Sequence, residues 1–244
     1  MTTRATNALV EQLMTHTSVR EYLDKPVPEE VCQAILDCAF AAASSCFLQV
    51  TSIIRVNDPE KRRLLAEYSG HQKHVITAPQ FWVFVADYHR NLAAVPDSDL
   101  GWAEQLIVGC TDTGIAAQSA YTAMESFGLG GVYVGGIRNH INEVAQLLEL
   151  PQNTIPLMGL AFGYPAYKNE VKPRLPQSLT VMTDRYVEPD PKALEDYGKT
   201  LSDYFANRKR NPKTSTWAGE VCAIMGRERR PFVDAFLKEK GWLR

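Results

Sequence analysis

Apolar positions recur at two spacings along the chain, and each spacing predicts one kind of element. Val31, Ile35 and Ala39 are spaced as one face of a helix, whereas residues 52–56 form a short β-branched run typical of a strand. The pair Asp58-Pro59 is typical of a helix start, with proline at the first helical position. On these patterns we expect helices at residues 9–14, 31–43, 60–68, 101–127, 141–150 (capped by Asn139), 192–206 and 231–240, and strands at residues 52–56, 80–85, 130–134 and 155–162.

The longest expected helix, residues 101–127, carries apolar or small side chains on nearly every side. Charged residues such as Glu104, Asp112 and Glu125 interrupt it too often for a membrane span. A helix of this kind lies in a core or a subunit interface. Its small residues, which include Gly109 and Ala120, permit close helix approach, so we favour the centre of a dimer.

The order of elements favours an α+β layer fold, because helices and strands mix without strict alternation. The 244 residues fit one domain, 1–244, in which residues 165–244 form an irregular and helical extension. Within it, residues 164–187 are proline-rich and residues 207–215 form a polar loop.

Composition narrows the functional classes. The formal charge of −2 gives no overall field that would attract nucleic acid or an anionic membrane. Residues 1–7 contain no apolar run typical of a signal peptide, and the five cysteines show no C-x-x-C spacing. Four of the cysteines lie in or at the ends of expected helices, where a buried thiol acts as a small apolar group. We therefore expect a cytoplasmic protein with reduced thiols.

Common catalytic signatures are missing from the sequence. Gly128–Gly131 matches the dinucleotide fingerprint only in part and precedes its expected strand, where that fingerprint must follow one. His71 and His74 stand three residues apart without a third ligand at metal spacing, so we expect no metal site.

Several polar clusters instead lie near the ends of apolar elements. They are His16–Arg20, Ser44–Gln49, Ser69–His74 and Lys172-Pro173-Arg174. Hydroxyls, imidazoles and cations so placed suit a phosphate and a polyol. Taken one at a time, each cluster is a weak signal, and an isolated H-x-S-x-R is better explained as a capped loop with an exposed arginine. The pair Gly135-Gly136 has two interpretations as well: a backbone that approaches a flat ring closely, or the end of a strand.

In this order the clusters resemble the oxygen-insensitive NADPH nitroreductases and NADPH–FMN reductases. The motifs that carry the resemblance are H-x-S-x-R, S-S-x-F-L-Q, G-x-Q-K-H, G-L-G-G-V-Y-x-G-G-x-R-N and K-P-R-L-P, and they span practically the whole chain. The resemblance implies an α+β fold with a central mixed or antiparallel sheet flanked by helices. It also implies an intertwined homodimer with FMN at the subunit interface and residues 165–244 wrapped around the partner.

The resemblance assigns site residues by matching position. For FMN these are His16, Thr17, Ser18, Arg20, Ser44, Gln72, Lys73, His74, Tyr133, Val134, Gly135, Gly136, Lys172 and Arg174; for NADPH or substrate they are Ser45, Cys46, Phe47, Arg208, Arg210, Lys213 and Arg230. The chain departs from the family pattern at Cys46, in place of serine, and at Lys213-Thr214, in place of two arginines. No side chain is expected to be catalytic, because FMN N5 carries the hydride chemistry.

The expected activity is NADPH-dependent reduction of nitroaromatics, quinones, chromate or free flavin in two-electron, ping-pong steps. Two alternatives stay open. One is a flavin reductase that supplies free reduced FMN, and the other is a flavin-binding protein without turnover. The basic segment 207–213 argues against the second, because a carrier needs no contact to the phosphate of NADPH.

Overall fold

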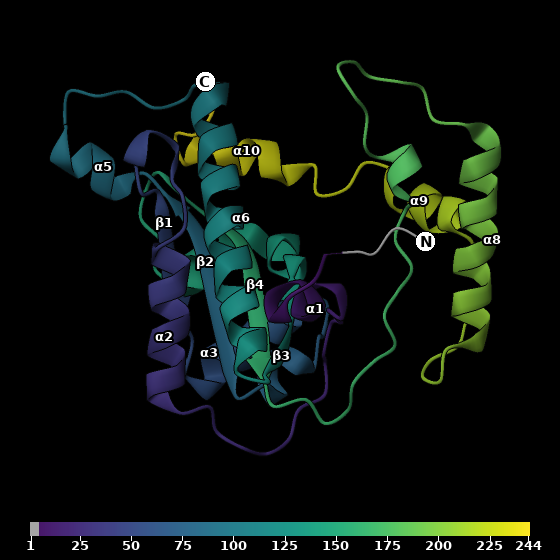
Figure 1. The fold of residues 1–244 in the computed structure, drawn as a ribbon. Helices are drawn as coiled ribbons and strands as arrows, with labels where there is room; N and C mark the ends of the chain where they lie inside the picture. Colours follow the sequence, from purple (N-terminus) through teal and green to yellow (C-terminus); the bar gives the residue numbers. More distant parts are fainter. Residues whose placement is uncertain (1–4) are drawn as a thin grey trace. The chain divides into compact units, whose positions relative to one another are not determined.

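The computed structural model describes residues 5–244, which form two compact units (Figure 1). Residues up to Lys168 together with Arg230–Arg244 make the first unit, and Asn169–Arg229 make the second. The expected extension over 165–244 thus divides, because its last fifteen residues return to the first unit.

The first unit is built on a four-stranded sheet in the order β1-β2-β4-β3. The strands are β1 (Thr51–Arg55), β2 (Gln80–Asp87), β3 (Gly130–Val134) and β4 (Thr154–Gly163), and every neighbouring pair is antiparallel. The alternative of a mixed sheet is therefore resolved in favour of an antiparallel one. The central strand β2 is apolar at almost every position because both of its faces are buried.

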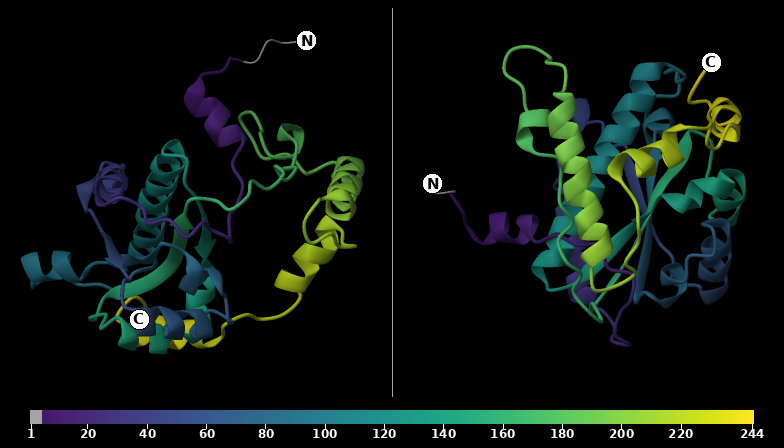
Figure 2. Two further views of the ribbon diagram at one scale, coloured as in Figure 1. Left: turned by 90° about the horizontal axis from the view of Figure 1, so that it is seen from below. Right: turned by 90° about the vertical axis from the view of Figure 1, so that its right-hand side faces the viewer.

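Helices cover both faces of this sheet (Figures 1 and 2). On one face α2 (Glu29–Phe40) and α6 (Ala103–Ser126) pack with Trp82 and Phe84. On the other face the side chains of Phe81 and Val83 pack with residues of α3 (Pro59–Tyr68), α4 (His74–Thr77), the 3₁₀ helix η2 (Gly135–His140), α7 (Ile141–Leu147) and α10 (Phe232–Glu239). Successive β2 side chains thus alternate between two cores.

The C-terminal residues complete the core of the first unit. Phe236 and Trp242 are fully buried, and Trp242 lies edge-on to Tyr88 at 5.2 Å between ring centroids. A Cβ at Gly109 would stand 2.9 Å from two atoms of the Trp242 ring. Gly109 therefore serves the packing of this chain's own tryptophan, which corrects the expectation that it serves close helix approach in a dimer. Ala120 is likewise buried in the core that α6 shares with α2.

The second unit has a small core of its own. It contains η3 (Gln177–Leu179), α8 (Pro191–Asn207) and α9 (Trp217–Met225). Tyr197, Leu201 and Phe205 form one buried stripe of α8, against which Trp217 packs. Asp190 caps α8 by accepting a hydrogen bond from the Lys192 amide at 3.0 Å.

Most expected elements are confirmed, with boundary shifts of a few residues. Asp58 caps α3 as expected and accepts from the amides of Glu60 and Lys61 at 2.8 and 2.9 Å. The sequence patterns missed three short helices, α4, α5 (His89–Ala94) and α9. The prediction that Asn139 caps the helix beginning at residue 141 was wrong. Asn139 lies inside η2, and His140 is the residue that precedes α7.

Further checks concern thiols, metals and membranes. Cys32 is buried as expected, but Cys38 and Cys46 are exposed, and no cysteine in the described residues is paired. Within residues 5–244 no three His, Cys, Asp or Glu side chains gather in a way that could hold a metal ion. Over the same residues, the helices are too short or too polar to cross a membrane.

Candidate functional site

The predicted glycine pair at the end of β3 lies against the loop that contains Gln72. A Cβ at Gly136 would stand 2.5 Å from the carbonyl oxygen of Ser69 and 2.6 Å from Nε2 of Gln72. The side-chain amide of Gln72, through Nε2, also donates a hydrogen bond to the Ser69 carbonyl at 2.7 Å. The close approach that requires glycine at Gly136 is therefore made by the protein's own loop. At Gly135 a Cβ would lie in ordinary van der Waals contact with the Arg138 guanidinium, whose atoms are 3.4–3.8 Å away, so this position is less crowded than Gly136.

Arg230 joins the same place from the far end of the chain. Its Nε and Nη2 donate to Oδ1 of Asn139 at 2.9 and 2.7 Å, and Nη2 also donates to the Gly135 carbonyl at 3.4 Å. Asn139 is thus not a helix cap but the acceptor that fixes this arginine. A residue predicted near the substrate lies beside residues predicted near FMN.

Arg20 and His74 bring two further predicted segments together. His74 is 8% exposed, and burial together with the charge of Arg20 lowers its pKa to about 4. At neutral pH the imidazole is therefore uncharged, and Arg20, whose side chain is exposed, supplies the positive charge at this place. Gln72 is half-buried, whereas Lys73 is exposed immediately before α4.

His16 is directed to α6. Its Nδ1 lies 2.8 Å from a carboxylate oxygen of Glu125, and its ring is edge-on to Tyr121 at 5.1 Å. Tyr121 in turn contacts the ring of Tyr133, at 5.0 Å between centroids. Thr17 lines a surface pocket beside these residues, together with Gln12, Thr15, Glu125 and Lys168. Sequence reasoning missed Glu125 as a partner of His16.

Three buried polar atoms in this region have no hydrogen-bond partner within residues 5–244. They are Oγ of Ser69, Nε2 of His74 and the hydroxyl of Tyr133. Buried polar groups in native proteins normally have partners, so each exception needs an explanation such as a catalytic role or an absent ion or water. One guanidinium, one neutral imidazole and several hydroxyls form a donor set that suits a phosphate ester with a polyol chain. The residues of the first unit therefore fit the cofactor that the sequence predicts.

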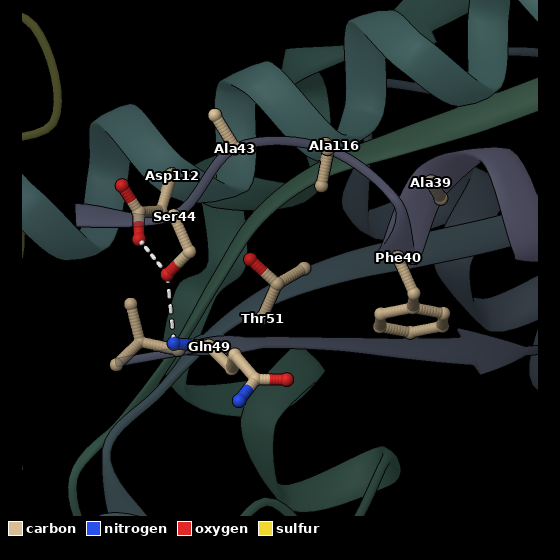
Figure 3. A pocket seen from close by; sticks show the side chains of 10 residues that line it. Ala39, Phe40, Ala43, Ser44, Gln49, Thr51, Asp112 and Ala116 are labelled. Atoms are coloured by element: carbon tan, nitrogen blue, oxygen red, sulfur yellow. Dashed lines mark hydrogen bonds between the residues drawn. The ribbon is translucent and has the colours of Figure 1, made fainter. Parts of the chain in front are cut away.

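The Ser44–Gln49 loop is held by a residue that sequence reasoning did not assign to the site. Asp112 of α6 accepts from Oγ of Ser44 at 2.7 Å (Figure 3). It also accepts from the Ser45 amide, at 3.0 and 3.1 Å. Ser44 Oγ accepts in turn from the Gln49 amide at 2.7 Å. Cys46 and Phe47 are exposed at the tip of this loop. The one available signal for Asp112 was its position as a carboxylate in an otherwise apolar stretch of helix.

In the second unit, the cations assigned to FMN and to NADPH form one cluster. Lys172, Arg208 and Lys213 surround the buried ring of Phe205, with charge-to-centroid distances of 5.5, 5.5 and 4.4 Å. Burial and the neighbouring charges of Arg174, Lys213 and Arg208 lower the pKa of Lys172. Glu220 pairs with Lys213 at 2.6 Å, and Arg210 is exposed on the loop that follows Arg208. The sequence had suggested two separate basic sites.

The antiparallel sheet between two helical layers defines an α+β protein of the nitroreductase type. Residues 13–164 match the model of the nitroreductase family, and residues 172–244 match that of the family's C-terminal domain. An oxygen-insensitive NADPH nitroreductase of Salmonella typhimurium is 44% identical over 96% of this chain and 97% of its own length.

Two solved structures extend the comparison. Nitroreductase A from Vibrio parahaemolyticus is 40% identical, with a TM-score of 0.92 over 97% of this chain and 98% of that one. The NADPH:FMN oxidoreductase from Vibrio harveyi, solved with NAD⁺, is 39% identical, with a TM-score of 0.91 over 96% and 98% of the two chains. The protein belongs to the nitroreductase family.

Proposed function

We propose that this protein is an FMN-dependent oxidoreductase that uses NADPH to reduce nitroaromatics, quinones and related electrophiles. The observation that carries the proposal is that distant segments meet in the first unit. Arg230 donates to the Gly135 carbonyl, Gly136 lies against Gln72, and the charge of Arg20 acts on His74. The names of the relatives, an NADPH nitroreductase and an NADPH:FMN oxidoreductase, support the same chemistry.

The residues of the first unit have distinct proposed roles. Arg20 supplies the charge for the FMN phosphate, and the hydroxyls of Thr17 and Ser18 suit the ribityl chain. The neutral imidazole of His74 offers a hydrogen bond without adding charge, and Gly135, having no side chain, would let backbone approach the flavin ring closely. Bound FMN would supply the hydride acceptor and donor, so the protein contributes binding, orientation and electrostatics. Arg230, held by Asn139, stands where it can orient a polar substrate group.

The cation cluster of the second unit is the proposed source of phosphate affinity there. Lys172 and Arg174 remain assigned to the FMN phosphate, and Arg208, Arg210 and Lys213 to the 2′-phosphate of NADPH. Guanidinium and ammonium groups gathered at one place attract a dianion more strongly than any one of them alone. The carboxylate of Glu220 offsets part of that charge at Lys213.

A homodimer is part of the proposal. Helix α1 (Ala8–Met14) buries none of its residues, and Leu9, Leu13 and Met14 are exposed on it. On α6, Ile107 and Ile115 are exposed as well. We propose that a second copy of the chain covers these apolar side chains, since large exposed apolar surfaces are typical of interaction sites. We place the protein in the cytoplasm, where thiols stay reduced.

The absorbance spectrum of the purified protein tests the proposed function. We expect a yellow protein with about one FMN per chain, because the cofactor carries the chemistry. Anaerobic addition of NADPH should bleach the flavin band, and a nitroaromatic should restore it. A colourless protein that cannot be reconstituted with FMN would refute the proposal.

A second candidate is the supply of free reduced FMN, favoured by the name of the Vibrio harveyi relative. The two activities separate in one assay, in which turnover on added FMN is compared with turnover on nitrofurazone at equal NADPH. A kcat/KM for free FMN above that for the nitroaromatic would assign the chain to the flavin reductases. The opposite ratio would assign it to the nitroreductases.

A further inference from the structure

The loop between α2 and β1 adopts an unfavourable backbone conformation. Cys46, Phe47 and Gln49 have φ angles of 48°, 57° and 55°, in the left-handed region. None of the three is glycine, and for L-residues this region costs roughly 1–2 kcal/mol each. Such conformations persist only where the surroundings fix them, and they are concentrated at functional sites. The groups that fix this loop are therefore worth identifying.

Asp112 holds the loop at its start. The residue is 4% exposed, and its carboxylate accepts from the hydroxyl of Ser44 and the amide of Ser45. Because the Ser44 hydroxyl accepts from the Gln49 amide, one chain of hydrogen bonds links α6 to both ends of the strained segment. Figure 3 shows the carboxylate, the hydroxyl and the amide in line.

Helix α5 holds the far end of the loop. Asn91 donates to the Leu48 carbonyl at 2.8 Å, and Arg90 donates to the Gln49 carbonyl at 3.2 Å. Between the two fixed ends, the ring of Phe47 is 78% exposed. Leaving a large aromatic side chain in solvent on a strained, doubly anchored loop has no packing advantage.

We propose that Asp112 is a positioning residue for the acceptor site, because it fixes the place at which the loop presents Phe47 and Cys46. The proposal rests on the proposed function together with the family resemblance, which assigns Cys46 and Phe47 to NADPH or substrate. An aromatic ring held in one orientation favours flat, aromatic electrophiles, since stacking depends on geometry. A small inorganic acceptor gains nothing from that ring. Asp112 thereby tunes the choice among acceptors without touching them.

The main test compares Asp112→Asn with Asp37→Asn, an exposed acid on α2 that leaves the loop intact. The asparagine removes one of the two accepting oxygens. We expect the KM for nitrofurazone to rise about tenfold, because losing one hydrogen bond to a charged group typically changes an equilibrium by about this factor. The kcat and the turnover of ferricyanide should stay nearly unchanged. Asp37→Asn should match the parent protein throughout. An Asp112→Asn variant with the parent KM would overturn the proposal.

The alkylation rate of Cys46 gives a readout that does not depend on turnover. Mass spectrometry of the labelled peptides separates Cys46 from Cys222, which is exposed in the second unit and serves as the internal reference. We expect Asp112→Asn to change the Cys46 rate relative to Cys222, and Asp37→Asn to leave that ratio alone. If Asp112→Asn does not fold, Asp112→Glu keeps the charge, displaces the carboxylate by one methylene and should give the same two changes.

A Phe47→Ala variant distinguishes the two ways in which the idea can fail. If Phe47→Ala leaves the nitrofurazone KM unchanged, the tip does not belong to the acceptor site and the assignment of Cys46 and Phe47 to substrate is wrong. If it raises the KM while Asp112→Asn changes neither the KM nor the Cys46 rate, the positioning role is wrong and the site assignment stands. If the site assignment and the positioning role are both correct, adding Asp112→Asn to the Phe47→Ala variant should raise the nitrofurazone KM little further.

Discussion

The two units present their polar residues in different ways. In the first unit, Gly136, Gln72 and Asn139 are held by short contacts within a packed scaffold, and a single exposed guanidinium, Arg20, provides charge near His74. In the second unit, the polar residues are the charged ends of long side chains gathered around one ring, Phe205. The first arrangement can recognise the shape of a ligand, whereas the second mainly recognises its charge.

This difference has a thermodynamic counterpart. Fixed donors in a buried setting bind with little dependence on salt, while exposed cations lose attraction as ionic strength rises. Burial and repulsion among the clustered charges lower the pKa of Lys172, and the pairing of Lys213 with Glu220 offsets part of that repulsion. The contrast predicts that a cofactor retained through turnover depends most on the first unit, and a coenzyme that comes and goes depends on the second.

The largest effect should come from removing the charge of the first unit. Arg20→Ala should weaken FMN binding by about 2–5 kcal/mol, the usual cost of removing one partner of a desolvated charge pair, while the fold survives. FMN content after gel filtration and circular dichroism measure the two parts. Arg174→Ala makes the same test in the second unit.

Arg63→Ala is the control, because this exposed arginine of α3 pairs only with Glu60 and Glu67 in the ion pairs of the described residues. Full FMN content in both Arg20→Ala and Arg174→Ala would place the phosphate elsewhere on the protein.

His74 predicts a pH dependence that belongs to the first unit. The unfolded imidazole takes up a proton near pH 6.5, but burial and Arg20 lower its folded pKa to about 4. Between these values the unfolded state binds more protons, so stability falls as the pH drops from 6.5 to 4, by about 3 kcal/mol in all. Urea unfolding across this range should show a flatter profile for His74→Gln. Identical slopes for the two proteins would contradict the assignment.

The second unit should set the coenzyme preference. Arg208→Ala should raise the KM for NADPH by roughly one to two decades, since a charge-assisted contact contributes about 1.5–3 kcal/mol, and should leave NADH nearly unaffected. Rising salt should weaken NADPH more than NADH. Lys192→Ala, an exposed cation at the start of α8, is the matched control. An equal effect on both coenzymes would assign the loop to folding or gating instead.

Two glycines give the smallest effects, with opposite signs. Gly136→Ala should destabilise the first unit by roughly 1–3 kcal/mol, because its Cβ would overlap the Ser69 carbonyl. Gly198 of α8 has no atom within 4 Å of its Cβ position, so Gly198→Ala should stabilise the second unit by about 0.5–1 kcal/mol. Thermal unfolding measures the stability of both variants. Destabilisation by Gly198→Ala would show that other atoms pack against α8 at this position.

Sequence periodicity predicted the long elements of the fold well. Helix α6 and strand β4 are both long apolar runs, and their different lengths and flanking residues identify one as a helix and the other as a strand. Helices α4, α5 and α9 were not predicted because they are too short to show a clear helical spacing of apolar residues. Helices this short are stabilised mainly by tertiary contacts. Asn139 was wrongly predicted to be a helix cap because an asparagine side chain can accept a hydrogen bond either from a helix amide or from a distant residue, here Arg230.

The candidate site was predictable where segments carry motifs and not where distant residues pair. Ser44 and Asp112 are 68 positions apart, His16 and Glu125 are 109 apart, and Asn139 and Arg230 are 91 apart. Nothing in the local pattern of Asp112, Glu125 or Asn139 names its partner. The merging of two basic segments around Phe205 was hidden for the same reason, because Lys172 and Arg208 meet only once α8 has formed.

The return of the chain at Arg230 has a consequence for synthesis on the ribosome. Phe236 and Trp242 belong to the core of the first unit, yet they are made after all of Asn169–Arg229. Until they emerge, the surface around Gly109 and Tyr88 lacks its tryptophan, so the first unit cannot finish folding before residues 230–244 have been made. The second unit, whose residues are contiguous, can fold while its predecessor is still open. Nascent chains truncated near residue 229 should therefore bind chaperones through the unfinished first unit.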